Sequence, residues 1–140
     1  MPNKVALFAD ENVRSPNFAF ASYKSVITDR WSKYTVSGGR IVSKDEVKEF
    51  VKAMLQKKEF HKATHNSYAY RIQLDDGWVL DGKNDDGETG AGNCVLRELQ
   101  RAQIVNVIVV VTRYYGWVKL HADRFKNVIE STKIFVERIS

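Results

Sequence analysis

Apolar and polar residues alternate from Thr64 to Leu74 with the two-residue period of a β-strand. The less apolar face begins at His65, and this pattern predicts a half-buried strand. The next residues, Asp75-Asp76-Gly77, predict a turn into a second short strand from Trp78 to Leu80. The apolar face carries Tyr68, Tyr70, Ile72 and Leu74, and the other face carries His65, Ser67, Ala69, Arg71 and Gln73.

Two further regions have the composition of strands. From Phe20 to Val42, β-branched and aromatic residues are interrupted by Thr28-Asp29-Arg30 and by Gly38-Gly39, which predicts a hairpin. Val107 to Thr112 is continuously apolar and β-branched, as expected of a strand in the middle of a sheet. The first 20 residues predict an irregular arm with one strand around Val5 to Phe8.

Three helices are predicted from caps and apolar spacing. Ser43-Lys44-Asp45-Glu46 is a capping box, and a one-sided apolar stripe follows it. A second helix is expected from about Asn93 to Ala102. A third is expected after Asp123, which can act as its N-cap. The outer face of the first helix carries Lys44, Lys48 and Lys52, which are expected to be solvated.

This order of elements predicts an α+β fold. We expect a two-layer sandwich in which a mixed β-sheet carries its helices on one face and leaves the other face partly open. Residues 1–24 form the predicted N-terminal arm, and residues 25–140 form the predicted domain.

Composition supports one globular domain in a reducing compartment. The chain has 140 residues, of which 44% are hydrophobic, enough for a sizeable core. The longest apolar run, Val107 to Val111, is far too short to cross a bilayer, and no targeting segment is visible. Cys94 is the only cysteine, so an internal disulfide is excluded and a cytoplasmic location is expected. A monomer is also expected.

The net charge of +5 is unevenly distributed. Six acidic residues and one lysine lie between Asp75 and Glu88, whereas Arg113 to Arg138 carries six basic and three acidic residues. The sequence therefore predicts a surface with two poles, which suits a protein partner as well as nucleic acid.

The acidic, glycine-rich segment from Asn84 to Gly92 is the densest cluster of residues that could take part in binding or catalysis. Its carboxylates could hold a divalent cation, or its glycine amides could hold a phosphate. It lacks the spacing of a P-loop or an EF-hand. We favour an architectural interpretation, in which Asp85, Asp86 and Glu88 satisfy backbone amides and the positive end of a helix.

Other chemistry has weaker support. His65 and Arg113 could approach the acidic segment, which would allow a metal-dependent hydrolase. No metal-ligand spacing and no dinucleotide fingerprint is present, so no metal or cofactor is expected. The basic and aromatic residues after Arg113 could bind RNA or the ribosome, but we favour a core role for Tyr114, Tyr115 and Trp117.

Five strings together resemble the IMPACT family, called YigZ in bacteria. They occur in unbroken order from about Ser25 to the C-terminus, and the last is closer to the eukaryotic branch. The strings are Ile27-Thr28-Asp29-Arg30; Ala63-Thr64-His65-Asn66 with Tyr68-Ala69-Tyr70-Arg71-Ile72; Asp85-Asp86-Gly87-Glu88-Thr89; Val110-Val111-Thr112-Arg113 with Tyr115-Gly116; and Asp123-Arg124-Phe125-Lys126.

The resemblance implies the βαβ fold of ribosomal proteins and of domain IV of elongation factor G. It also implies a non-enzymatic role in translational control and the stress response. Eukaryotic members restrain the general amino-acid-control kinase by competing for its ribosome-associated activator, and they can bind monomeric actin. We expect a binding surface formed by His65, Asp85, Asp86, Glu88, Arg113, Tyr115, Lys119, Asp123, Arg124 and Lys126.

Two departures from the family pattern stand out. Eukaryotic members usually carry an N-terminal RWD domain, and only about 24 residues precede the matched region here. The family's Gly-Gly is Gly116-Trp117 in this chain, and its Leu-Gly is Leu120-His121, so a bulkier turn is expected.

Overall fold

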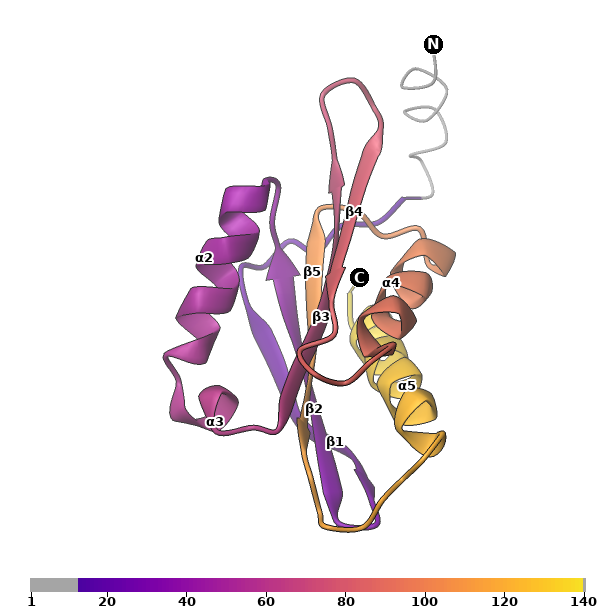
Figure 1. Ribbon diagram of the computed structural model, residues 1–140. Coiled ribbons are helices and arrows are strands. Elements are labelled where there is room, and N and C mark those ends of the chain that lie inside the picture. Colours follow the sequence, from indigo (N-terminus) through magenta and orange to yellow (C-terminus); the bar gives the residue numbers. More distant parts are fainter. Residues whose placement is uncertain (1–12, 140) are drawn as a thin grey trace.

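The computed structural model describes residues 13–139. Within this range the fold is α+β, as predicted, with one sheet in the order β1-β2-β5-β3-β4 (Figure 1). Every neighbouring pair of strands is antiparallel, so the predicted mixed sheet is wrong. The elements are β1 (Ala21–Asp29), β2 (Ser32–Arg40), α2 (Lys44–Leu55), α3 (Lys58–His61), β3 (His65–Gln73), β4 (Val79–Asn84), α4 (Ala91–Arg101), β5 (Val107–Tyr114) and α5 (Asp123–Glu137).

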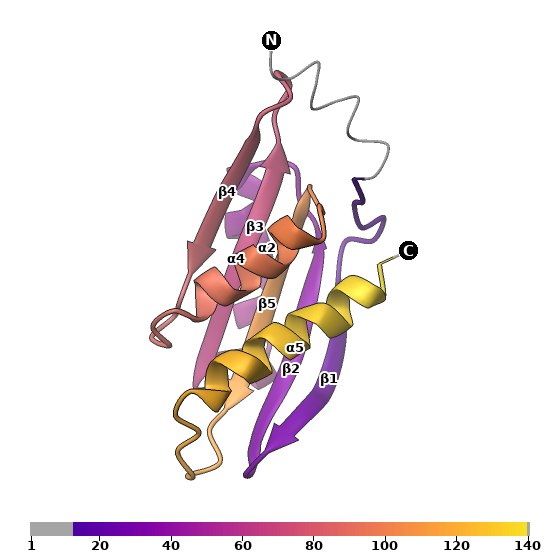
Figure 2. The same cartoon turned by 90° about the vertical axis from the view of Figure 1, so that its right-hand side faces the viewer.

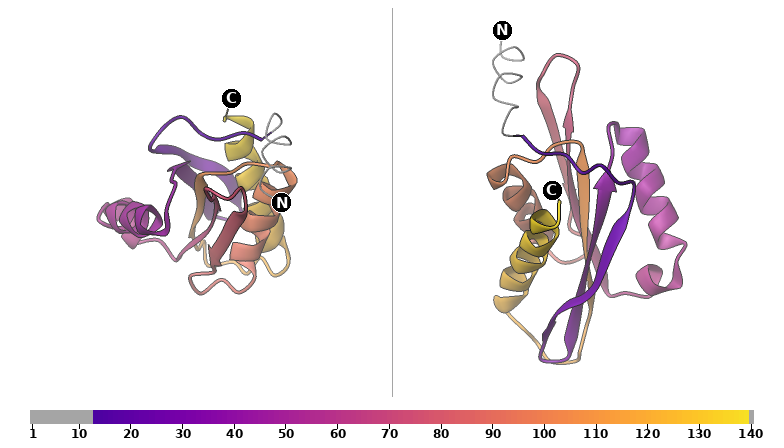
Figure 3. Two further views of the ribbon diagram at one scale, coloured as in Figure 1. Left: turned by 90° about the horizontal axis from the view of Figure 1, so that it is seen from above. Right: turned by 180° about the vertical axis from the view of Figure 1, so that it is seen from behind.

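Helices cover both faces of this sheet. Helices α4 and α5 lie side by side across one face, while α2 and α3 pack on the opposite face (Figures 1 and 2). The view from above separates the two helical layers clearly (Figure 3). The prediction of helices on one face is therefore wrong, and the fold has three layers.

The central strand β5 shows why two helical layers are needed. Its side chains alternate between the faces of the sheet. Val107, Val109 and Val111 belong to the core under α4 and α5, whereas Ile108 and Val110 belong to the core under α2 and α3. Burial of both faces of a strand requires cover on both, and the apolar run from Val107 to Val111 reflects this requirement.

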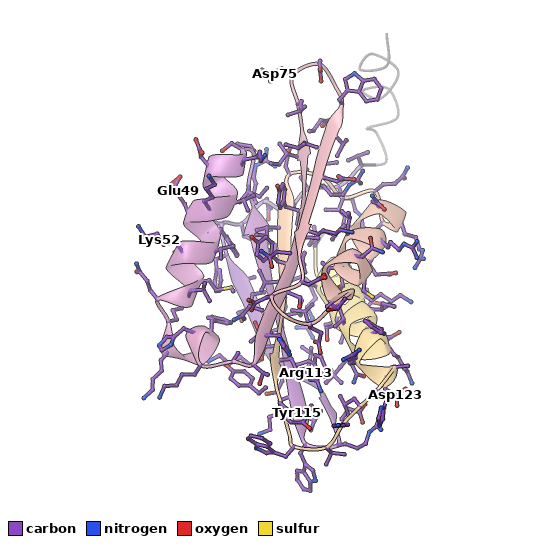
Figure 4. The ribbon with its side chains drawn as sticks, in the orientation of Figure 1. Glu49, Lys52, Asp75, Arg113, Tyr115 and Asp123 are labelled. Atoms are coloured by element: carbon purple, nitrogen blue, oxygen red, sulfur yellow. The ribbon has the colours of Figure 1, made fainter. Side chains whose placement is uncertain are left out.

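Helix α2 begins at the predicted capping box. Ser43 Oγ accepts a hydrogen bond from the Glu46 amide at 3.1 Å. Glu46 Oε1 accepts from the Val42 amide at 2.7 Å, one residue before the amide expected for a capping box. The lysine stripe is exposed as predicted, and Figure 4 shows Glu49 and Lys52 directed away from the sheet. The short helix α3 was not predicted, and its Phe60 is buried against the sheet.

The predicted β1–β2 hairpin is confirmed, with one revision. Gly38 and Gly39 do not interrupt the strand; they lie within β2. A Cβ on Gly38 would lie 2.7 Å from Phe135 Cζ, so the glycine allows α5 to approach the sheet closely. β4 begins one residue after the exposed Trp78, which was predicted to lie in that strand.

The N-terminal segment packs against the sheet before β1 begins. The Arg14 amide donates to the Gln103 carbonyl, and the Arg40 amide donates to the Phe18 carbonyl. β1 starts at Ala21, within the stretch expected to be an arm. The expected strand from Val5 to Phe8 lies outside the described residues. No helix of residues 13–139 has the length and apolar character needed to cross a membrane.

Candidate functional site

A cavity of about 410 Å³ lies where the start of β3 and the end of β5 meet the acidic loop and the start of α5. Arg113, Tyr115 and Asp123 lie toward this end of the molecule in Figure 4. Six of the ten predicted binding residues line the cavity. The full lining is Thr64, His65, Gly87, Glu88, Arg113, Tyr115, Lys119, Leu120, His121 and Arg124.

A buried ion pair between Arg113 and Glu88 belongs to this lining. Arg113 Nη1 donates to Glu88 Oε2, and the two side chains are 7% and 2% exposed. The pair links the end of β5 to the loop before α4. Replacing either residue alone would leave the other as a buried charge without a partner, which is strongly unfavourable.

The other two carboxylates of the acidic loop bind backbone amides. Asp85 Oδ2 accepts from the Gly90 amide at 3.0 Å, and Oδ1 accepts from the Gly92 amide at 2.8 Å. Asp86 Oδ2 accepts from the Asn66 amide at 2.6 Å. The architectural interpretation is confirmed for Asp85 and Asp86, because Asp85 fixes the start of α4 and Asp86 ties the loop to β3.

His65 is oriented by the same loop. Its Nδ1 lies 2.9 Å from the carbonyl oxygen of Asp86. Because a carbonyl oxygen only accepts, Nδ1 donates this hydrogen bond. The nearby carboxylates of Asp86 and Glu88 hold other groups. The hydrolase hypothesis therefore gains no acid–base pair from this geometry.

Three cations give the cavity a positive character. Arg113, Lys119 and Arg124 line it, and Glu88 is the single acidic residue among its lining. The Nε atoms of Arg113 and Arg124 are buried and have no hydrogen-bond partner among the described residues. The guanidinium of Arg124 lies 5.0 Å from the centroid of the Phe125 ring.

Asp123 and Lys126 lie outside this lining. Asp123 is the first residue of α5 and not its N-cap, which is Ala122. Its carboxylate pairs with Arg30, which also binds Asp29 and so joins the β1–β2 turn to α5. Hydrogen bonds from Arg30 and from Asn127 lower the pKa of Asp29 below its ordinary value. Lys126 is exposed.

Two exposed tryptophans lie next to the cavity. Trp117 is 86% exposed and Trp31 is 76% exposed. The prediction that Trp117 closes the core is therefore wrong, whereas Tyr114 and Tyr115 are partly buried. Gly116 packs directly on the backbone of Trp31, which brings the two tryptophan-bearing turns together. Trp31 was not predicted as a site residue, and its only signal was a large aromatic residue inside a turn.

Two of the six carboxylates of the predicted acidic pole are paired with cations in the fold. Asp81 pairs with Arg71 at 2.9 Å, and Glu88 pairs with Arg113. Asp75 and Asp76 remain exposed in the β3–β4 turn, at the end opposite Arg113 (Figure 4). No cluster of His, Cys, Asp and Glu within residues 13–139 is arranged to hold a metal ion. Cys94 lies in α4 as predicted, and burial raises the pKa of its thiol.

Comparison with known proteins identifies related chains. The sequence model of the Impact N-terminal domain matches residues 30–135. Protein IMPACT of Rattus norvegicus is 40% identical over 114 residues, which cover 80% of this chain and 36% of that protein. The Protein IMPACT homolog of Dictyostelium discoideum is 36% identical over 107 residues, covering 76% of this chain and 31% of that protein. This chain thus matches about a third of the length of these relatives.

Two solved structures share the fold. The two-domain translational regulator Yih1 superposes with a TM-score of 0.58 and 30% identity, covering 84% of this chain and 46% of that one. A hypothetical protein superposes with a TM-score of 0.76 and 23% identity, covering 89% of this chain and 60% of that one. The second likeness concerns the fold alone.

Proposed function

Because this chain belongs to the IMPACT family, we propose that it regulates translation in the cytoplasm by binding other proteins. The support is the match over residues 30–135 and the similarity to a structure described as a translational regulator. In finer terms, the chain competes for the ribosome-associated activator of the general amino-acid-control kinase and so restrains the stress response. Monomeric actin is a second protein partner under this proposal.

The end of the molecule around the cavity is the proposed contact surface. The observation that carries this assignment is the pair of exposed tryptophans, Trp31 and Trp117, beside a cavity that contains Arg113. Tryptophan, tyrosine and arginine dominate the binding energy of protein interfaces. A large exposed apolar side chain costs solubility, so two at one end favour a binding role.

The proposal is for binding without turnover. His65 is bound to the Asp86 carbonyl, and the carboxylates of Asp86 and Glu88 are bound to Asn66 and Arg113. These contacts favour a rigid recognition surface over a set of groups that exchange protons with a substrate.

A competition experiment tests this function. The purified chain is added to a cell extract in which the kinase has been activated by uncharged tRNA, and kinase output and activator capture are measured. We expect the chain to capture the activator and lower kinase output. A Trp31→Ala/Trp117→Ala variant should lose both effects, whereas Trp78→Ala at the opposite end should keep them. Equal activity of both variants would contradict the assigned surface.

RNA binding is the second candidate, favoured by the cations Arg113, Lys119 and Arg124 at the same end. Phosphate contacts make affinity fall steeply with salt. Capture repeated after nuclease treatment separates the two candidates, because RNA-held partners disappear and protein-held partners stay.

A further inference from the structure

The cavity carries more positive charge than its own residues neutralise. Arg113, Lys119 and Arg124 are cationic side chains, and Glu88, the acidic residue of the lining, is already paired with Arg113. Such a lining attracts an anion, and guanidinium groups match the planar fork of a carboxylate or phosphate.

Arg113 is held in place before any ligand arrives. Its side chain is 7% exposed, Glu88 binds Nη1, and its guanidinium lies 5.5 Å from the Tyr115 ring centroid. Its Nε has no partner among the described residues, and neither has the Nε of Arg124. A buried donor without an acceptor is unfavourable. Because both arginines line the cavity, an oxyanion bound there would supply hydrogen-bond acceptors for their guanidinium groups.

The mouth of the cavity disfavours a chain of phosphates. Asp86, next to the lining residue Gly87, is exposed, and its carboxylate accepts from a neutral backbone amide. This charge would repel the successive phosphates of an RNA strand, whereas the charge of Asp123 is already paired with Arg30. The Tyr115 ring is also occupied, since Arg113 and Trp117 both pack near it, and it is therefore a poor platform for a base. A single oxyanion with uncharged neighbours fits better.

We propose that the cavity binds one oxyanion on a side chain of the protein partner, and that a phosphorylated residue binds more tightly than a carboxylate. This inference rests on the proposed function, because the partner is a protein. A phosphoryl group carries up to two charges and three acceptor oxygens, which suits a cavity with three cations better than a single carboxylate does. Trp31 and Trp117 would then pack on the residues that flank the anion. The partner's phosphorylation would thereby control its affinity for this chain.

A titration with short neutral peptides tests the proposal. Three peptides differ only in a central phosphoserine, aspartate or serine, and binding to the full chain is followed by the NMR signals of the Arg113 and Arg124 Nε–H groups. We expect the phosphoserine peptide to bind at least about tenfold more tightly than the serine peptide. The aspartate peptide should fall between them, and both arginine signals should shift.

Matched variants identify the residues responsible. Arg124→Gln and Lys119→Gln should each weaken phosphoserine binding at least about fivefold. Lys133→Gln removes the same charge from an exposed position on α5 and should leave binding unchanged. Arg113 is not chosen for the main test, because its replacement leaves Glu88 buried and unpaired and endangers folding.

Three results would overturn the proposal: equal binding of the phosphoserine and serine peptides, equal weakening by Lys133→Gln and Arg124→Gln, or tighter binding of adenosine monophosphate than of the phosphoserine peptide. The last would make the cavity a nucleotide site. The activator experiment depends on Trp31 and Trp117 and not on the anion. The chain can therefore capture the activator even if the titration shows no preference for phosphoserine. Failure of one proposal is therefore distinguishable from failure of the other.

Discussion

Asp85 acts as a helix cap although it lies five residues before the N-cap position. The N-cap of α4 is Gly90, which has no side chain and adopts a left-handed φ of 92°. Asp85 reaches across the loop and accepts from the amides of Gly90 and Gly92. A carboxylate here also opposes the positive end of the helix dipole. One side chain therefore supports both the loop and the start of α4.

We expect Asp85→Ala to lower the free energy of unfolding by about 1–2 kcal/mol, the typical effect of losing a capping side chain. The measurement is urea denaturation followed by circular dichroism. Asp75→Ala makes the same chemical change at an exposed turn position and should change stability by less than about 0.5 kcal/mol. An equal loss in both variants would show that overall charge, and not the bonds to Gly90 and Gly92, explains the effect.

Single residues were predictable where the partner is close in sequence. The Ser43 cap on the Glu46 amide was predicted correctly because the contact is local, although Glu46 binds the Val42 amide and not that of Ser43. The Arg113–Glu88 pair joins residues 25 apart, so the sequence could suggest an approach but not a buried bond. The exposure of Trp117 was missed because aromatic residues usually join cores, and sequence carries no direct measure of solvent contact.

Neighbouring segments pack closely against strand β2 at both of its glycines, Gly38 and Gly39. A Cβ on Gly38 would lie 2.4 Å from the Ile108 carbonyl oxygen and 2.7 Å from Phe135 Cζ. A Cβ on Gly39 would lie 1.9 Å from the Ala19 carbonyl oxygen. Both neighbours include backbone, which cannot move aside easily. The close packing of β2 against β5 and α5 therefore depends on the absence of a side chain.

Gly38→Ala should cost about 1–3 kcal/mol, because an extra methyl group in a packed core forces its neighbours apart. The midpoint of thermal unfolding should fall accordingly. Lys33→Ala in the same strand is an exposed control and should have little effect. Full stability of Gly38→Ala would mean that α5 can shift away from β2 without cost.

Arg30 joins two elements at the end of the molecule that holds the cavity. It binds Asp29 at the end of β1 and Asp123 at the start of α5, and Asn127 of α5 also donates to Asp29. The hydrogen bond from Arg30 is the main cause of the lowered pKa of Asp29. A carboxyl group whose pKa is lower in the folded state stabilises the fold above its unfolded pKa. This stabilisation is lost as the pH falls through the folded pKa.

The stabilising contribution of Asp29 should therefore be complete near neutral pH and decline as the pH falls below about 4, near the ordinary pKa of an aspartate. Wild type should unfold at a higher temperature than Asp29→Asn at pH 7, and the two midpoints should converge in acid. Asp76→Asn serves as the control, since its carboxylate lies in the distant β3–β4 turn. A gap that persists unchanged at pH 3 would contradict an ionic role for Asp29.

At the scale of the whole molecule, the element order was predictable apart from the short helix α3, but the layering was not. The period-two pattern from Thr64 to Leu74 and the apolar run of β5 gave the correct strands. The same run, Val107 to Val111, already required cover on both faces, yet the direction in which α2 crosses the sheet is not encoded in any local pattern. Antiparallel pairing of β3 with β5 likewise depends on contacts between residues over thirty positions apart, such as Arg71 and Val107.

The segment before β1 packs against β2, α5 and the residues that precede β5. Phe18 packs edge to face on Phe135 of α5, with ring centroids 6.0 Å apart, and its carbonyl accepts from the Arg40 amide. Arg14 pairs with Ile104 in an isolated parallel bridge. These contacts precede residue 30, where the family match begins. The folded unit thus extends beyond the matched region, and this extension should contribute measurably to stability.

Phe18→Ala removes the aromatic contact with Phe135 but keeps the backbone bond to Arg40. Because Phe18 is partly buried, we expect a loss of about 1–3 kcal/mol, below the range for a fully buried phenylalanine. Trp78→Ala, which shortens an aromatic side chain that is 56% exposed, should change stability by less than about 0.5 kcal/mol. Denaturation of both variants in urea provides the comparison. If Phe18→Ala is as stable as Trp78→Ala, the segment before β1 only rests on α5, and the independently stable unit begins with the β1–β2 hairpin.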